Sequence, residues 1–371
     1  MATVSSSVTG LASIADDGTD TGTLNITSGT LASTSLSQFT GYSTINVSAN
    51  AAHVIDVPTT ILASTSATLT MVVTSTIGVS FTGANLTGTQ LKVNLTASEG
   101  ADTITGGPDD DTLVGGDGND LIRGGSGNGD DVISGGAGDD TVTGGDGADS
   151  LFGSDGAELM YGNVGNDLLS GGSAADTLYG GQGNDSIVGG DGNDLLWGND
   201  GADSMLGHNG ADVIYGNKGN DTLSGGDGAD SLFGGQGNDS IDGGTSADIV
   251  YGNLGNDTLI GGADADWLYG GQGNDTLSGG AGADVLAGNR GDDLLIGGTA
   301  GDVFLMGTPS GNDTIGDFDN ALGDQISLAS GITWSAADVG GSAVVTFSNG
   351  ATVTLTGVAA ASVVDGWFTT G

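Results

Sequence analysis

A nine-residue period of glycine and acid dominates the chain. From Asp140 to Asp302 an acidic residue recurs at every ninth position, inside a Gly-rich nonapeptide such as GGQGNDSIV, Gly180 to Val188. We number this repeat G1-G2-x3-G4-x5-D6-x7-U8-x9, where U is an apolar residue. The glycine-rich half predicts a turn that needs positive φ. The x7-U8-x9 half predicts a three-residue strand in which U8 points away from x7 and x9.

The period also predicts how the repeats stack. One repeat cannot bury its single apolar residue alone, so neighbouring repeats must share a core. Two repeats return the chain above itself and make an 18-residue coil. We therefore predict an all-β fold, a parallel β-roll (β-solenoid) over residues 101–302, with the U8 side chains forming a thin core between two short parallel sheets.

The residues outside this array have ordinary β patterning. Residues 1–100 are rich in Ser and Thr, and we predict a β domain there that anchors, assembles or caps the roll. Residues 303–371 predict a small β cap. Within the cap, Asn349-Gly350 separates two alternating runs between Ala343 and Leu355, which predicts a hairpin.

The charge of the chain bears on its partners. The formal charge is −43 and only four residues are basic, so we expect no binding to nucleic acid or to an anionic membrane through charge. The absence of Cys excludes disulfides and zinc–thiolate sites. No apolar run is long enough to predict a transmembrane segment, and the start, MATVSSSVTG, lacks the features of a Sec signal peptide.

The acidic residues fall on the two edges of the predicted roll. Stacked coils would bring D6 carboxylates within ~5 Å of one another, where each pair repels by ~0.8 kcal/mol in water and by more at a lower dielectric. Acid at a fixed period therefore predicts bound cations rather than disorder. Carboxylate and carbonyl oxygens are the ligands of Ca²⁺, whereas Mg²⁺ is too small and dehydrates too reluctantly for such a turn.

We predict that the D6 aspartates and the turn carbonyls bind calcium. The first edge carries Asp149, Asp167, Asp185, Asp203, Asp221, Asp239, Asp257, Asp275 and Asp293; the second carries Asp140, Asp176, Asp194, Asp212, Asp230, Asp248, Asp266, Asp284 and Asp302; Asp111, Asp120 and Asp131 precede them. The expected carbonyl donors include Gly181, Gly183, Gly190, Gly192, Gly235, Gly237, Gly271 and Gly273. One ion per step between turns gives on the order of 20 Ca²⁺. Asp102 and Glu158 also occupy D6, and Glu158 is the single exception to Asp between 140 and 302.

The two edges differ in regularity. The first edge has mostly Asn or Asp at x5, and the second mostly Ala. On the second edge G4 is replaced by Ala174, Ser246 and Asp264, where a side chain strains a turn with positive φ. Calcium is therefore expected more firmly on the first edge. At those three turns, closure by hydrogen bonds alone is the alternative.

The motifs GGQGNDSIV and GGDGNDLLW resemble the RTX (repeats-in-toxin) nonapeptide GGxGxDxUx over the whole array. This resemblance implies a parallel β-roll with Ca²⁺ between successive turns. It also implies type I secretion from a Gram-negative bacterium, through an uncleaved C-terminal signal, to the outside of the cell. The tail from Gly311 to Leu328 is similar to the segment that follows such rolls in secreted members.

Signatures of catalysis are missing from the sequence. Neither His53 nor His208 has a partner pattern, and His208 is interpreted as a solvated side chain at x3 of a turn. There is no H-E-x-x-H and no G-x-S-x-G, so the proteases and lipases that carry such rolls are not represented. We predict a protein that is not an enzyme, although a divergent enzyme within residues 1–100 stays open.

The x9 residues that follow the second edge are aromatic. They are Tyr161, Tyr179, Trp197, Tyr215, Phe233, Tyr251 and Tyr269, and their counterparts on the other sheet are mostly small, polar or aliphatic. Stacked aromatics can simply stabilise a parallel sheet, by roughly 0.2–1 kcal/mol for each pair. The alternative that we favour is an interface, because one apolar stripe over many coils exceeds what a soluble monomer usually exposes.

These observations predict a secreted calcium-binding structural protein. It would fold on Ca²⁺ outside the cell and self-assemble, as a homo-oligomer or polymer, into a surface layer, filament or matrix at the cell surface. The alternative is a calcium-dependent adhesin or glycan-binding module that contacts cell-surface polysaccharide.

Overall fold

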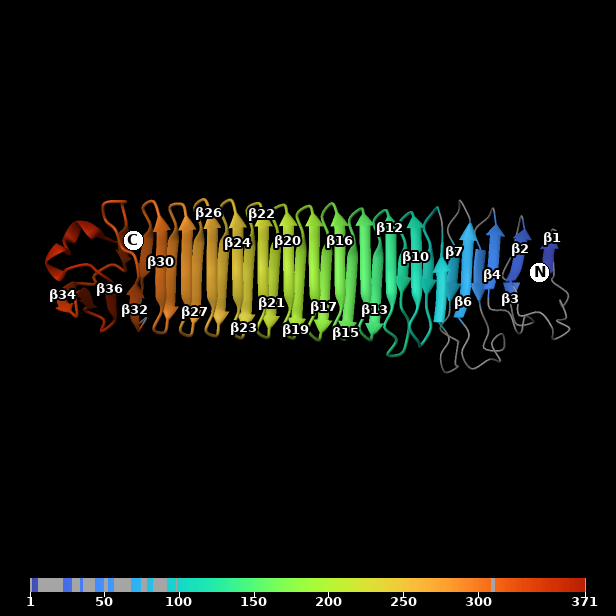
Figure 1. The fold of residues 1–371 in the computed structure, drawn as a ribbon, viewed down its shortest axis with the longest axis horizontal. Helices are drawn as coiled ribbons and strands as arrows, with labels where there is room; N and C mark the ends of the chain where they lie inside the picture. Colours follow the sequence, from blue (N-terminus) through green and yellow to red (C-terminus); the bar gives the residue numbers. More distant parts are fainter. Residues whose placement is uncertain are drawn as a thin grey trace. The chain divides into compact units, whose positions relative to one another are not determined.

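The computed structural model describes strands between residues 2 and 96 and then residues 97, 99–307 and 311–370. The chain divides into two units, Met1–Gly190 and Asp191–Gly371, and each is described by itself. Both units are all-β and are built from parallel stacked coils, as the repeat period predicts (Figure 1). No helix among the described residues is long and apolar enough to span a membrane.

The first unit contains eighteen strands. They are β1 (Ala2–Ser5), β2 (Thr23–Ser28), β3 (Thr34–Ser35), β4 (Thr44–Ala49), β5 (His53–Asp56), β6 (Thr68–Thr74), β7 (Val79–Thr82), β8 (Lys92–Thr96), β9 (Thr103–Thr105), β10 (Thr112–Asp117), β11 (Leu121–Arg123), β12 (Val132–Ala137), β13 (Thr141–Asp146), β14 (Ser150–Asp155), β15 (Leu159–Val164), β16 (Leu168–Ser173), β17 (Thr177–Gln182) and β18 (Ser186–Asp191).

The second unit continues with the same kind of strand and ends in a cap. Its elements are β19 (Leu195–Asp200), β20 (Ser204–Asn209), β21 (Val213–Lys218), β22 (Thr222–Asp227), β23 (Ser231–Gln236), β24 (Ser240–Thr245), β25 (Ile249–Leu254), β26 (Thr258–Ala263), β27 (Trp267–Gln272), β28 (Thr276–Ala281), β29 (Val285–Arg290), β30 (Leu294–Thr299), β31 (Val303–Met306), β32 (Asn312–Ile315), β33 (Gln325–Leu328), β34 (Trp334–Val339), β35 (Ser342–Phe347), β36 (Thr352–Leu355), the 3-10 helices η1 (Ala360–Ser362) and η2 (Asp365–Trp367), and β37 (Phe368–Thr370).

Array strands alternate between two sheets within each unit. We call them the even sheet (β10 to β18 and β20 to β30) and the odd sheet (β9 to β17 and β19 to β29), after the strand numbers. Neighbours in a sheet are parallel and in register at one coil, so that Tyr161 faces Tyr179 and Tyr215 faces Phe233. Each coil therefore holds 18 residues between those partners, which confirms the predicted two-repeat coil.

The predicted strand length was wrong. We expected three residues, x7-U8-x9, but most array strands contain six, as in β21 (Val213–Lys218). The parallel ladder continues beyond G1, and Asn217 at G2 pairs with Gly235. Glycine was interpreted only as a turn residue, yet here it extends the strand because it lets the stacked backbones approach closely.

The U8 side chains form the core, as predicted. In β21 to β23 they are Ile214, Leu223 and Leu232, and each is at most 1% exposed. The flanking x7 and x9 side chains are half-buried or exposed, which gives the alternating burial that a strand requires. One aliphatic residue per repeat therefore makes a continuous but thin apolar layer.

Strand pairing crosses both boundaries that the sequence pattern indicated. In the first unit β8 pairs in parallel with β10, and buried Phe81 of β7 lies opposite Ile104. In the second unit β31 pairs with β29 and β32 with β30. The predicted hairpin is present, because β35 and β36 are antiparallel and Ala343 lies opposite Leu355.

Candidate functional site

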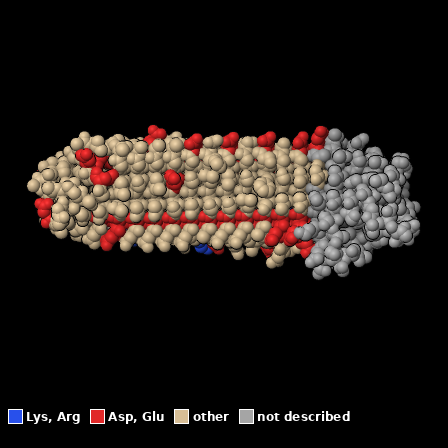
Figure 2. Space-filling view, in the orientation of Figure 1, with Lys and Arg blue, Asp and Glu red and all other residues tan. Residues whose placement is uncertain are grey.

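The D6 carboxylates are buried inside the turns. Every D6 residue from Asp102 to Asp302 is at most 5% exposed, although Asp and Glu are rarely buried without a partner. In each unit they form two columns, one along each edge of the coils, and Figure 2 shows acidic residues lined up along the array. The structure therefore brings the predicted aspartates together in the way that the spacing indicated.

One oxygen of each carboxylate bonds to the neighbouring coil. The backbone N–H of Asp212 donates to Oδ1 of Asp230 at 2.8 Å, and that of Asp221 donates to Oδ1 of Asp239 at 2.9 Å. The same bond joins Asp149 to Asp167 in the first unit, at 2.8 Å. These bonds fix the orientation of each carboxylate before any metal binds.

The other oxygen, Oδ2, is buried and has no hydrogen-bond partner in much of the described array. This holds for Asp120, Asp140, Asp149, Asp167, Asp212, Asp221, Asp230, Asp239, Asp248, Asp257, Asp266, Asp275, Asp284, Asp293 and Asp302. A buried carboxylate oxygen without a partner costs several kcal/mol, on the order of the penalty for an unpaired buried charge. A cation removes that cost, so these atoms fit a metal site.

The G1 glycine keeps a small space open beside Oδ2. At Gly207 a Cβ atom would collide with Oδ2 of Asp212 and would lie only 2.6 Å from the carbonyl oxygen of Gly225. At Gly216 it would collide with Oδ2 of Asp221 and lie 2.6 Å from the carbonyl oxygen of Gly234. A carboxylate oxygen and a carbonyl oxygen thus converge on one volume.

These donors have the chemistry that calcium requires. Among the side chains that the structure describes, no three His, Cys, Asp or Glu gather closely enough to hold a metal by themselves. The donor set is instead one carboxylate per turn together with backbone carbonyls. That all-oxygen set suits Ca²⁺, which accepts six to eight oxygen ligands in flexible geometry.

Sequence reasoning missed the role of G1 and placed the carbonyl cradle at G2 and G4. Those glycines, including Gly181, Gly183, Gly235 and Gly237, do have positive φ as expected. Yet G2 and G4 tolerate replacement, whereas G1 is Gly in every repeat from Gly144 to Gly297. That constancy was the signal, and its cause is the space beside the carboxylate.

The irregular turns keep their carboxylates in place. Ala174, Ser246 and Asp264 have φ of 72°, 77° and 73°, so the predicted positive φ at G4 is confirmed, and Ala300 adds a fourth case at 86°. Even so, Asp248, Asp266 and Asp302 in these turns are at most 1% exposed, and each retains a buried Oδ2 without a hydrogen-bond partner. Hydrogen bonds alone therefore do not satisfy these turns.

His208 lies at G2, not at x3 as the sequence analysis placed it. Its φ is 82°, and its side chain is exposed, which agrees with the solvated state that we expected. Asn163, Asn199, Asn217, Asn253 and Asn289 also occupy G2 with φ between 73° and 79°. Asn tolerates this region better than most residues, which explains its use there. His53 lies in β5, and its side chain is outside the described residues.

The x5 asparagines form a further ladder on the first edge. The backbone N–H groups of Asn238, Asn256 and Asn274 each donate to Oδ1 of the x5 Asn one coil earlier, at 2.7 Å. Ala at x5 on the second edge cannot accept such a bond. The difference between the two edges therefore includes a side-chain ladder that holds the turns of the first edge together.

Burial raises the pKa of the D6 carboxyls. The pKa is raised to about 7 for Asp221 and Asp230 and to about 6 for Asp239. Desolvation is the largest cause, hydrogen bonds from the backbone oppose it, and neighbouring carboxylates add to it. The pKa of Glu158 also lies well above its usual range, because of burial and the nearby Asp176. Protons therefore compete with a metal for these groups.

In the absence of calcium, acid should stabilise the array. The folded-state pKa of Asp221 is about 7 against an ordinary value of 3.8, so its stabilising effect is complete below that ordinary value and is lost as pH rises through about 7. In chelator the array should therefore resist urea better near pH 4 than near pH 8. In saturating calcium this order should reverse, because metal ligands must be deprotonated. Circular dichroism during urea titration measures both, and a flat profile in chelator would contradict the expectation.

The aromatic residues predicted as an interface all lie on the odd sheet and stack on one another. In the first unit the ring centroids of Tyr161 and Tyr179 are 5.0 Å apart. In the second unit the rings of Trp197, Tyr215, Phe233, Tyr251 and Tyr269 follow at 4.8–5.7 Å, with interplanar angles of 3–12°. Each ring is half-buried by its neighbours, so the stack contributes to the stability of the sheet as well as to its surface.

Comparison with protein families agrees with this geometry. A model described as the RTX calcium-binding nonapeptide repeat matches residues 96–129, 126–157, 152–187, 179–214, 206–241, 242–277 and 269–304. A comparison with curated proteins finds no match. The family match covers more than half of the chain and coincides with the stacked coils, their buried D6 columns and their U8 core. The chain is therefore a member of the RTX calcium-binding nonapeptide-repeat family.

Proposed function

We propose that the protein is a non-enzymatic structural component that self-assembles at the cell surface, as a layer, filament or matrix. Membership in the RTX family indicates calcium binding and a secreted protein. The finer role, with type I secretion from a Gram-negative cell, D6 aspartates as calcium ligands and copies joined to one another, is our proposal. The observation that carries it is the aromatic stack on a single sheet.

The surroundings of the stack favour a contact surface. Beside it on the odd sheet lie the x7 residues, of which Ile249 is 41% exposed and Trp267 is 50% exposed. The matching x7 positions of the even sheet, from β20 to β28, hold only Ser and Thr. A stack that served only internal stability would be as useful on either sheet, so the one-sided placement favours a partner.

The charge of this surface favours a second copy of the chain as that partner. Strands β19 to β29 of the odd sheet contain three charged residues, Asp200, Lys218 and Arg290, and Lys218 pairs with Asp200 at 2.8 Å. The acidic columns lie at the edges of the coils instead. Two copies of a chain with a charge of −43 can therefore meet through this sheet without bringing those columns together.

Replacing Tyr215, Phe233 and Tyr251 together by Ser should weaken assembly and leave calcium-dependent folding largely intact. The substitutions remove the centre of the stack but leave U8 and the D6 columns unchanged. Aromatic contacts at a buried interface are each worth roughly 1–2 kcal/mol or more. Light scattering and electron microscopy in calcium report assembly, and circular dichroism reports folding.

A matched control removes apolar side chains from the other sheet. Leu206, Ile260 and Ile296 occupy x9 on the even sheet, and their joint replacement by Ser should leave assembly unchanged. If the two triple variants assemble equally well, the stack is an internal stabiliser and the proposed interface is wrong. If the wild-type protein stays monomeric in calcium and binds polysaccharide, the adhesin alternative is the better description.

A further inference from the structure

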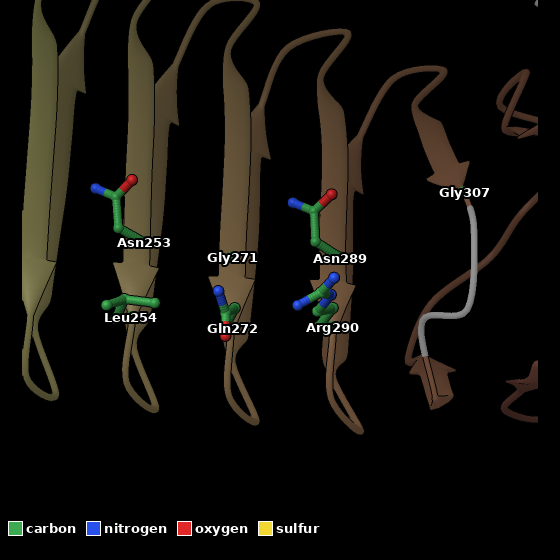
Figure 3. Close-up of a pocket in the computed structure, with 7 residues that line it drawn as sticks. All are labelled: Asn253, Leu254, Gly271, Gln272, Asn289, Arg290 and Gly307. Atoms are coloured by element: carbon green, nitrogen blue, oxygen red, sulfur yellow. The ribbon is translucent and has the colours of Figure 1, made fainter.

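An open groove of about 470 Å³ lies on the odd sheet of the second unit, beside the aromatic stack. It is lined by three consecutive strands of that sheet, β25, β27 and β29, and by the residue that follows β31 (Figure 3). The lining residues are Asn253, Leu254, Gly271, Gln272, Asn289, Arg290 and Gly307. Nothing in the calcium columns or in the proposed assembly accounts for this groove.

The groove exists because one side chain is missing from a row. In register across the sheet, Gly271 lies between Asn253 and Asn289, and Figure 3 shows the two amides projecting on either side of the glycine. Nδ2 of Asn289 donates to the carbonyl of Ala287 at 3.3 Å, which holds that amide against its own strand. The second row consists of Leu254, Gln272 and Arg290, also in register.

The lining offers two kinds of polar group and one apolar contact. The Arg290 side chain is exposed and makes no ion pair with the residues that the structure describes, although the chain is strongly acidic. A guanidinium binds carboxylate or sulfate through paired N–H donors. The amides of Gln272 and Asn289 can donate to and accept from hydroxyl groups. Leu254 is 41% exposed and provides an apolar patch for C–H groups.

The two rows extend along the sheet with a period of two coils. The first row is Asn217, Gly235, Asn253, Gly271 and Asn289, and the second is Lys218, Gln236, Leu254, Gln272 and Arg290. At strand spacing, two coils advance by roughly 9.5 Å. Hollows and amides that recur at this step match a linear polymer whose repeat is a disaccharide, with a basic residue in the first and last of these five coils.

We propose that this groove binds an acidic polysaccharide that runs along the coils, with its carboxylate or sulfate on Arg290 and its hydroxyls on the Asn and Gln amides. The inference goes beyond the proposed assembly, because it needs no contact between copies. It supplies what assembly alone lacks, namely a means of attachment to a surface coated with such a polymer. Bound calcium offsets most of the acidity that would otherwise repel the ligand.

Isothermal titration calorimetry on the full-length protein in calcium tests the proposal. The probes are defined oligomers of a polyuronate, of a sulfated polysaccharide and of a neutral glucan. We expect one or both acidic oligomers to bind and the neutral one to bind much more weakly. The preferred acidic oligomer identifies the anion. Equal binding of the neutral oligomer, or no binding of either acidic one, would overturn the proposal.

Three variants separate the groove from general charge effects. Arg290→Gln should weaken binding by roughly tenfold or more, the loss expected for a charged hydrogen bond. Gly271→Asn should fill the hollow with a residue that neighbouring coils already carry at G2, and it should weaken binding similarly. Arg123→Gln removes a cation from β11, outside the groove, and should leave binding unchanged. Equal loss in Arg290→Gln and Arg123→Gln would show nonspecific attraction.

Failure of this inference is distinguishable from failure of the proposed assembly. The Tyr215, Phe233 and Tyr251 variant should still bind the acidic oligomer, because none of these residues lines the groove. Conversely, Arg290→Gln and Gly271→Asn should still assemble in calcium. Circular dichroism of each variant confirms that the array is folded. If the groove variants fold and retain wild-type affinity, the groove is not the binding site.

Discussion

Removing calcium with a chelator at neutral pH should unfold the array. The D6 columns would then hold buried carboxylates with unpaired Oδ2 atoms and like charges one coil apart, over a core of one aliphatic per repeat. A ligand at 100 times its Kd adds about 2.7 kcal/mol for each site that exists only in the folded state. A handful of calcium sites therefore matches the roughly 5–15 kcal/mol by which a typical domain is stable.

Far-ultraviolet circular dichroism during calcium titration measures this effect. We expect a disordered spectrum in chelator and a cooperative gain of β structure at about 10⁻⁴–10⁻³ M calcium, the range of extracellular modules. Magnesium at the same concentration is the control and should restore little, because it dehydrates reluctantly. A spectrum that chelator leaves unchanged would show that the columns are stable without metal.

Changing one G1 glycine to alanine, Gly216→Ala, should disrupt its turn and the calcium sites next to it. The new Cβ would collide with Oδ2 of Asp221 and lie 2.9 Å from its Cγ and 2.6 Å from the carbonyl oxygen of Gly234. Overpacking alone costs roughly 1–3 kcal/mol, and displacement of the carboxylate adds the loss of a ligand. The midpoint of the calcium titration should therefore move to higher concentration, and the urea midpoint in calcium should fall.

Gly235→Asn is the matched control for this substitution. Gly235 has a φ of 114°, whereas Gly216 has no positive φ, so ordinary reasoning from backbone conformation would rank Gly235 as the more sensitive position. Its column neighbours Asn217 and Asn253 already show that this position accepts Asn. Calcium affinity should be nearly unchanged in Gly235→Asn. Equal tolerance of both substitutions would contradict the role assigned to the space beside the carboxylate.

Much of the fold followed from the spacing of residues in the sequence. The period of nine fixed the two-repeat coil, the burial of U8 at Ile214 and Leu232, and the gathering of D6 into columns. The aromatic column was predictable for the same reason, since Tyr215 and Phe233 lie 18 residues apart and face each other. Local turn chemistry at Asn349-Gly350 predicted the hairpin of β35 and β36.

Other features depend on contacts between coils and were not predictable from one repeat. The six-residue strands arise because parallel pairing continues through G2, as between Asn217 and Gly235. The role of G1 depends on a carbonyl from the next coil, such as that of Gly225 beside Gly207. The groove depends on which G2 residue lies between which neighbours. In each case the deciding atom belongs to a residue about 18 positions away.

The register of the coils makes the length of this protein a quantity that changes in steps. A duplication or loss of 18 residues restores every partner, because strands such as β21 and β23 are related by that shift. A change of nine residues would instead exchange the edges and move the later aromatic residues, beginning with Phe233, to the opposite sheet. Small irregularities are absorbed in turns, as between Asp111 and Asp131, which lie 20 residues apart yet still bond. Homologous genes should therefore vary in length by pairs of repeats, and a lineage could lengthen its surface coat without redesigning a single contact.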